Sequence, residues 1–168
     1  MAKKTETITL YVSEMLYEVQ NNSFLTGKSR KAGENHEQVA NIQASDDDED
    51  KNKILRSIQV AASELRNVMS EYLTGTSTTD NNILLDDSKT KTIVYTLSMP
   101  SNYNQATVEA ITQASHDYIV NRAVSDWLLI TDKSDAQDYL AKAKANAAAI
   151  TMALSKRVCP SRTAPSTT

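Results

Sequence analysis

The spacing of apolar residues along the chain predicts a mainly helical protein. The clearest pattern lies between residues 54 and 72, where the apolar side chains fall on one stripe of a helix, namely Ile54, Leu55, Ile58, Ala62, Leu65, Val68, Met69 and Tyr72. Gly75 follows this segment as a C-terminal cap. The acidic run Asp46 to Asp50 precedes it, where the helix dipole favours negative charge. A long amphipathic helix is therefore predicted here.

Two further helices are predicted near the C-terminal end, over residues 105–131 and 134–157. Ser134 stands at the cap of the second, with Asp135 and Asp138 in its first turn. Its apolar residues form a seam with a period of about 3.5 residues, made of Ala136, Leu140, Ala143, Ala147, Ile150 and Leu154. Because only Asp132 and Lys133 separate the two helices, we expect an antiparallel helical hairpin.

The first fifty residues divide into an apolar part and a polar part. Apolar residues at three- and four-residue spacing predict a helix over residues 7–21, carried by Ile8, Tyr11, Val12, Met15 and Val19. From Gly27 to Asp50 the chain is polar, with Val39 and Ile42 as its only branched apolar residues. Such a segment has too little apolar surface to fold by itself. We expect either a mobile loop or an arm that a partner orders, and Val39 and Ile42 are therefore candidates for a protein interface.

One strand is predicted over residues 92–99, where Ile93, Tyr95, Leu97 and Met99 alternate with more polar residues and Pro100 ends the run. The backbone amides of a strand need hydrogen-bonding partners. Either residues 83–85 supply a short second strand, or a neighbouring subunit does. The second alternative makes Ile93, Tyr95 and Leu97 candidates for a protein interface.

Together these elements predict a mainly α fold: a helical bundle with a C-terminal helical hairpin, one short strand or hairpin, an extended N-terminal arm and an extended C-terminal tail. We divide the chain into residues 1–50 (helix and polar, acidic arm), 51–157 (body, with the strand at 91–99) and 158–168 (tail). Only three glycines and three prolines occur in 168 residues, which argues against a β-sandwich or barrel. The tail cannot join a helix. Together with the end of the last predicted helix it adds four interface candidates: Arg157, Cys159, Pro160 and Arg162.

Charge and cysteine content limit the classes of function. The net charge of −3 gives no global attraction to nucleic acid or to anionic lipid. Cys159 is the single cysteine, so no intrachain disulfide forms, which fits a reducing compartment. Neither an unbroken apolar run after the N-terminal lysines nor a long apolar segment is present. We therefore expect no membrane partner, and a cytoplasmic product or a particle assembled in the cytoplasm.

The candidates for chemistry each have a simpler interpretation. His116 is next to Asp117, but neighbouring helical residues point in different directions, which favours a structural or surface role over a catalytic pair. Trp127 is either a core anchor or an interface hot spot. The acidic run lacks the glycine turn and the spaced ligands of a calcium loop. A solvated helix start is therefore the favoured interpretation of its five residues, which are Asp46, Asp47, Asp48, Glu49 and Asp50. We assign no catalytic, cofactor or metal residue and expect a non-enzymatic protein that acts through contacts with other chains.

The order of the pieces resembles a known family. The residues that carry the resemblance are Ser98-Met99-Pro100-Ser101-Asn102-Tyr103, then Asp117-Tyr118 and Asp126-Trp127-Leu128, then the segment from Tyr139 to Arg157 followed by Pro160-Ser161-Arg162. This order is similar to the small helical head–tail connector (adaptor) proteins of tailed bacteriophages and prophages, especially those of Bacteroides-type hosts. The resemblance is best over residues 91–162 and looser in the first half.

The resemblance implies a structural virion protein without an active site or cofactor. Family members form a homo-oligomeric ring, here expected to be dodecameric, which binds beneath the portal protein, contacts tail or neck proteins and lets DNA pass without sequence-specific contacts. Its place is the neck of the virion, assembled in the host cytoplasm. The acids Asp46 to Asp50 would then belong to a channel lining or an arm, because an acidic lining lets DNA slide without adhering.

Two other classes of function stay open at this point. The chain could serve as another phage assembly protein, such as a tail-completion protein or a small DNA-packaging subunit, and the latter would bind duplex DNA in a salt-dependent way. Alternatively, it is an unrelated cytoplasmic helical interaction protein or enzyme. A small ligand bound near His116, Asp117 and Trp127 would favour an enzyme.

Overall fold

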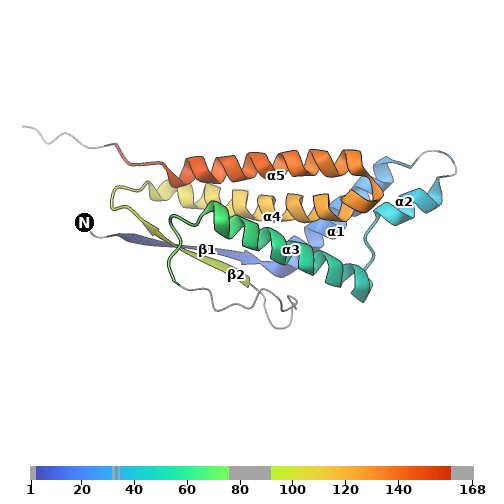
Figure 1. Ribbon diagram of the computed structural model, residues 1–168, viewed down its shortest axis with the longest axis horizontal. Coiled ribbons are helices and arrows are strands. Elements are labelled where there is room, and N and C mark those ends of the chain that lie inside the picture. Colours follow the sequence, from blue (N-terminus) through green and yellow to red (C-terminus); the bar gives the residue numbers. More distant parts are fainter. Residues whose placement is uncertain (1–2, 32, 34, 76–91, 160–168) are drawn as a thin grey trace, which may run out of the picture.

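The computed structural model describes residues 3–31, 33, 35–75 and 92–159 of the chain. Figure 1 shows an elongated bundle whose elements follow the order β1 (Lys4–Tyr11), α1 (Val12–Ser29), α2 (His36–Ile42), α3 (Asp48–Val68), β2 (Thr92–Met99), a short 3-10 helix η1 (Gln105–Thr107), α4 (Val108–Thr131) and α5 (Lys133–Leu154). The prediction of a mainly α bundle with a C-terminal helical hairpin and little strand is confirmed.

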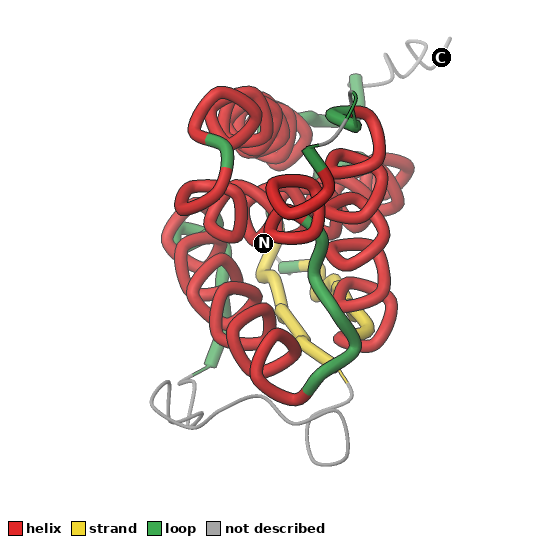
Figure 2. The backbone as a smooth tube through the Cα atoms, turned by 90° about the vertical axis from the view of Figure 1, so that its right-hand side faces the viewer, coloured by secondary structure: helices red, strands yellow, loops and turns green. Residues whose placement is uncertain are grey.

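Helix α4 is the centre of the bundle. It packs against α1, α3, α5 and β1, and its buried residues lie on several sides of the helix rather than on one stripe. A helix that is apolar nearly all round is expected to be surrounded by other elements. Helix α5 runs back along α4, and the two form the predicted antiparallel hairpin (Figure 1). Viewed along the long axis, the strands lie in the middle with helices on either side and above them (Figure 2).

The two strands pair with each other in an antiparallel sheet, in which Ile8 lies opposite Tyr95 and Leu10 opposite Ile93. The predicted inward face of β2 is confirmed, because Ile93, Tyr95, Leu97 and Met99 are all buried in the core. The Tyr95 hydroxyl donates a hydrogen bond to the carbonyl oxygen of Ala62 on α3 at 2.9 Å. The strand is therefore paired with β1 of its own chain, a partner that neither predicted alternative named. Residues 83–85, the other suggested partner, lie outside the described residues.

The helix predicted over residues 7–21 is wrong at its start. Ile8 and Tyr11 belong to β1, and α1 begins only at Val12. The β-branched residues Thr5, Thr7 and Thr9 alternate with the residues that face the helices, which favours an extended chain. Ile8 and Val12 are four residues apart. This spacing fits one continuous helix and also a strand followed by a helix, so the apolar pattern did not distinguish between these two structures.

The polar segment is also more ordered than predicted. Residues 36–42 form α2, and α3 begins at Asp48 inside the acidic run, so the expected free arm is largely helical. Val39 and Ile42 are buried, and Ile42 belongs to the core of the chain itself. The indole Nε1 of Trp127 donates to the carbonyl oxygen of Ile42 at 2.8 Å, which ties α2 to α4. The chain's own bundle therefore holds this segment, whereas the two predicted alternatives were a mobile loop and an arm ordered by a partner.

A polar network fixes α3 against α4. The Arg122 guanidinium donates to both carboxylate oxygens of Glu64, at 3.0 and 3.2 Å, and the Tyr118 hydroxyl donates to Glu64 Oε2 at 3.2 Å. Burial of the phenol, followed by the nearby Glu64 carboxylate, raises the pKa of Tyr118 to about 12. Both causes disfavour the charged phenolate. Tyr118 therefore stabilises the fold up to the ordinary tyrosine pKa of 10.0, and this contribution is lost as the pH rises towards 12.

The variant Glu64→Gln is expected to lower the pKa of Tyr118 while leaving it above 10.0, because burial is the larger cause and remains. Ultraviolet titration of tyrosinate absorbance measures this shift. The protein has seven tyrosines, so the signal of Tyr118 is obtained by subtracting the curve of Tyr118→Phe. An unchanged titration midpoint in Glu64→Gln would show that the carboxylate does not act on the phenol.

Candidate binding groove at the α2 end

Helix α2 lies unusually close to the C-terminal part of α1, and Gly27 permits this approach. A Cβ atom at Gly27 would lie 2.6 Å from Gln43 Cγ and 3.1 Å from the carbonyl oxygen of Val39. A larger residue would require the Gln43 side chain to move and the Val39 carbonyl to give way by a few tenths of an ångström. Two hydrogen bonds hold the following segment in place, because Gln43 Nε2 donates to the Phe24 carbonyl at 3.3 Å and the Ala44 amide donates to Ser23 Oγ at 3.0 Å.

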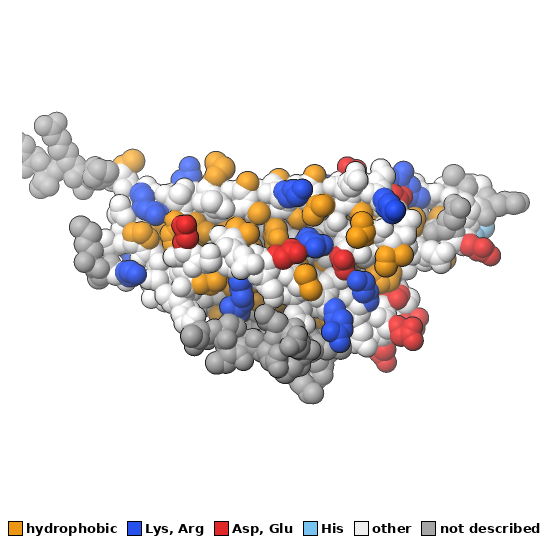
Figure 3. Space-filling view, in the orientation of Figure 1, with side chains coloured by type: hydrophobic (Ala, Val, Ile, Leu, Met, Phe, Trp, Pro, Cys, Tyr) orange, Lys and Arg blue, Asp and Glu red, His pale blue; other side chains and the backbone are white. Residues whose placement is uncertain are grey.

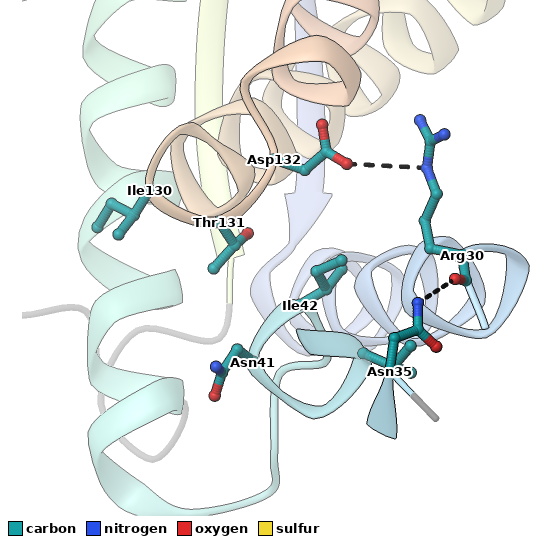
Figure 4. A pocket seen from close by; sticks show the side chains of 8 residues that line it. Arg30, Asn35, Asn41, Ile42, Ile130, Thr131 and Asp132 are labelled. Atoms are coloured by element: carbon teal, nitrogen blue, oxygen red, sulfur yellow. Dashed lines mark hydrogen bonds and ion pairs between the residues drawn. The ribbon is translucent and has the colours of Figure 1, made fainter. Parts of the chain in front are cut away.

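This packing leaves a groove of about 850 Å³ between α2, the end of α1 and the turn that joins α4 to α5. Its lining includes the α2 residues Val39 and Ile42, which are buried. Figure 4 shows Ile130, Thr131 and Asp132 on one side of the groove and Arg30 and Asn35 on the other, with Ile42 between them. Ile130 is 80% exposed, which is the highest value among the exposed large apolar residues of the described chain.

The rim of the groove carries charges of both signs. Arg30 Nε lies 3.7 Å from Asp132 Oδ2, and the same atom donates to Asp135 Oδ2 at 3.0 Å. The hydrogen bond with Asp135 raises the pKa of the Arg30 guanidinium above its usual range. Asn35 Nδ2 donates to the Arg30 carbonyl at 2.9 Å. Val39, Ile42 and Ile130 give the groove a small apolar part within a mostly polar lining. A small apolar part surrounded by hydrogen-bonding groups is also found in protein interfaces, so this groove can receive a side chain from another protein.

The predicted interface residues of β2 do not join this site. Ile93, Tyr95 and Leu97 are buried beneath the helices of their own chain, so the prediction that they contact another chain is wrong. The physical reason is that β1 supplies the hydrogen-bonding partner and α3 supplies the apolar cover. Of the predicted interface residues, Val39 and Ile42 alone line the groove in the described chain.

The C-terminal end of α5, after which Arg157 and Cys159 follow in sequence, lies at the opposite end of the molecule (Figure 1). Arg157 Nη1 donates to the carbonyl oxygens of Leu154 and Lys156, at 2.8 and 3.0 Å, so this side chain closes the end of α5. The Val158 amide donates to the Asn102 carbonyl at 2.8 Å. Cys159 is exposed and has a free thiol. Pro160 and Arg162 lie outside the described residues.

The acidic run forms an exposed corner beside α2. Asp48, Glu49 and Asp50 occupy the first turn of α3, as its predicted place at a helix start implies. Asp46 pairs with Lys51 Nζ at 2.8 Å, and the hydrogen bond from that lysine lowers the pKa of Asp46. Asp47 and Asp50 accept hydrogen bonds from Ser45. Asp46, Asp47, Asp48 and Glu49 are exposed at one end of the molecule, so their carboxylates can also make electrostatic contacts with another molecule.

The remaining candidates for chemistry have structural neighbours. His116 Nδ1 lies 3.6 Å from Asp117 Oδ1 and 3.9 Å from Glu18 Oε2 on α1. Trp127 is partly buried and holds α2 through its indole N–H, so it belongs to the support of the groove. In the described ranges, no group of three His, Cys, Asp or Glu side chains is arranged to hold a metal ion.

Sequence reasoning predicted Val39 and Ile42 and missed the other described residues of the groove, among them Ile130 and Arg30. Ile130 is the next-to-last residue of a predicted helix, and an apolar residue at a helix end carries no sign of its exposure. Arg30 and Asp135 are far apart in sequence, so their contact follows only from the packing of α1 against the start of α5. One indication of this contact is present in the sequence. Asp135 stands near the start of α5 and Arg30 at the end of α1, and each charge is favourable beside the dipole of its own helix.

Comparison with known proteins adds no relative to this description. No protein-family model matches the chain, and no curated protein or solved structure matches it. In the part of the chain that the structure describes, no helix has both the length and the apolar character that a bilayer crossing requires.

Proposed function

We propose that this chain is a structural subunit of a phage neck, forming a ring beneath the portal that joins the capsid to the tail and surrounds the path of the DNA. The groove at the α2 end is the observation that carries the proposal. It combines the buried apolar residues Val39 and Ile42 with the exposed Ile130 and a rim of mixed charge. Such a surface receives an anchoring side chain from another protein.

The proposed role involves no catalytic step and no cofactor, since a connector acts only through its contacts. Each subunit of a ring presents one surface to the portal or tail and two different surfaces to its neighbours. The groove occupies one end of the elongated bundle, which leaves the long helices available for contacts between neighbouring copies (Figure 1). In this proposal a portal or tail segment fills the groove.

The acidic corner supports the passage of DNA. Asp46, Asp47, Asp48 and Glu49 are exposed at the same end of the molecule as the groove. Repeated around a ring, these carboxylates would give a negatively charged rim, which repels phosphate and keeps DNA from adhering. We place them on or near the channel for this reason.

The proposal is tested by mixing the purified chain with the portal protein of the same phage and separating the complexes by sedimentation. The chain is expected to sediment with the portal, and labelled copies are expected at the neck of intact virions. Absence from virions, together with no portal binding, would reject the proposal. A strong shift of duplex DNA that weakens steeply with salt would instead favour a DNA-packaging subunit.

A further inference from the structure

Two exposed helix faces of this molecule complement each other in size and charge. The first, which we call the α1 ridge, consists of Tyr17, Asn21, Phe24, Leu25 and Lys28 on the outward side of α1. Apart from the neighbours Phe24 and Leu25, consecutive positions are three to four residues apart, and all five share one side of the helix. Tyr17, Phe24 and Leu25 are 66%, 48% and 50% exposed. Large side chains this exposed on one helix face mark a surface that contacts another protein.

The second face, the α5 track, consists of Asp138, Ala141, Ala145, Ala149 and Met152 on the outward side of α5. Helix α5 uses its other side to pack on α4, through Ala136, Ala143, Ile150 and Leu154. All five residues of the track are exposed, and Met152 is 62% exposed. Figure 3 shows hydrophobic side chains along the length of α5 on the surface of the molecule. Because alanine side chains are short, another helix can approach α5 closely at this face.

Within one copy, these two faces do not cover each other. Helices α1 and α5 meet where α1 ends, through the pair Thr26 and Tyr139 at 3.3 Å and the ion pair between Arg30 and Asp135. The side chains of the ridge and the track remain exposed. Both faces are therefore available for contact with another molecule.

We propose that the α1 ridge of one copy packs antiparallel on the α5 track of the next copy. This inference rests on the proposed ring and names the two surfaces that join its subunits. In the register that sets Asn21 opposite Ala145, Leu25 lies opposite Ala141 and Tyr17 lies opposite Ala149. Two of the three large side chains of the ridge, Tyr17 and Leu25, then meet alanines of the track, as close helix packing requires. Phe24 lies opposite Lys142, whose long aliphatic stem can lie along the ring.

Charge selects the direction of this pairing. In the antiparallel register Lys28 lies opposite Asp138, and Glu14 lies opposite Met152, one turn from Lys156; all four charged side chains belong to exposed residues. If the helices ran parallel from the same central pair, Glu14 would instead face Asp138, and Lys28 would lose its acidic partner. Like charges at an interface are costly, so the antiparallel arrangement is favoured.

The direction also suits a closed ring. In a single copy α1 runs towards the α2 end, whereas α5 starts there and runs back (Figure 1). A neighbour reached by a small rotation keeps nearly the same orientation, so its α5 still opposes the first copy's α1. The ridge and the track are different surfaces, and such head-to-tail contacts generate a ring if the rotation closes.

Cysteine cross-linking of the full chain tests this register. In a Cys159→Ser background, the double variant Asn21→Cys with Ala145→Cys is expected to form a ladder of dimers, trimers and larger species on mild oxidation, because disulfides need Cα atoms within about 7 Å. The matched control pairs Asn21→Cys with Thr151→Cys, an exposed residue on another side of α5, and is expected to give no ladder.

The absence of a ladder from the double variant would overturn the proposal. Dimers formed by Ala145→Cys alone would also overturn it, because they report a symmetric contact between two α5 helices.

Charge exchange gives a second test. Lys28→Asp and Asp138→Lys are each expected to weaken self-association by about tenfold, and their combination is expected to restore it. No rescue in the combination contradicts the pairing.

These outcomes separate the inference from the proposed function. Rings that bind the portal but give no ladder would reject the α1–α5 contact and leave the connector role intact. A ladder and rings without portal binding would reject the connector role and leave the contact intact.

Discussion

Replacing Tyr95 with alanine is expected to lower the free energy of unfolding by about 3–5 kcal/mol. The side chain is fully buried between β2 and α3, where Arg66 lies over its ring with the guanidinium carbon 5.2 Å from the ring centroid. Its hydroxyl also donates to the Ala62 carbonyl. Truncation therefore removes apolar contacts and a hydrogen bond that joins the sheet to the bundle. A loss of this size is a large part of the stability of a typical domain. Urea denaturation followed by circular dichroism measures it.

Two further variants make this result specific. Tyr95→Phe keeps the ring and loses only the hydrogen bond, so a loss of about 1 kcal/mol is expected. Val94→Ala changes the exposed neighbour on the same strand and is expected to cost less than about 0.5 kcal/mol. If Tyr95→Ala were as stable as the unmodified chain, the inward face of β2 would be in doubt, and the original interface prediction for Ile93, Tyr95 and Leu97 would return.

Replacing Ile130 with aspartate is expected to weaken portal binding by tenfold or more, following the loss of about 2 kcal/mol that is typical of an interface hot spot. Ile130 is the most exposed large apolar residue of the groove and stands beside its buried apolar residues. A carboxylate at this position would have to be desolvated against them. Because the side chain faces solvent in the single copy, we expect little change in stability. Binding is measured by calorimetry or by sedimentation with the portal.

Val60→Asp is the matched control for this variant. Val60 is 52% exposed on α3 and lies beside Arg56 and Arg122, away from the groove. The same change of an exposed apolar residue to aspartate should leave portal binding unaltered. Equal loss of binding in both variants would mean that the groove has no special part in the contact.

The sequence patterns predicted the elements whose burial is periodic. The stripe of α3 from Ile54 to Leu65, the alternation of β2 and the alanine-rich seam of α5 all appear in the structure with the expected faces buried. These patterns work because one face of each element meets the core, so the period of the apolar residues reports the geometry of the backbone.

The errors occur where a local pattern permits two answers. Residues from Ile8 to Val12 fit a helical spacing, yet pairing with β2 makes Ile8 part of a strand, and that partner is far away in sequence. The segment around Val39 and Ile42 has too little apolar surface to fold by itself. It packs on the bundle because Gly27 permits a close approach to α1 and the Trp127 indole donates a hydrogen bond to the Ile42 carbonyl. Long-range contacts of this kind leave no periodic signal, so the groove itself was not predicted.

Native mass spectrometry of the purified full chain tests the ring most directly. At a concentration of roughly tens of micromolar, we predict one dominant closed species with about twelve times the 18.5 kDa mass of the chain. The Lys28→Asp variant is expected to dissociate into smaller species under the same conditions. A single species of 18.5 kDa under the same conditions would contradict both the ring and the contact that builds it.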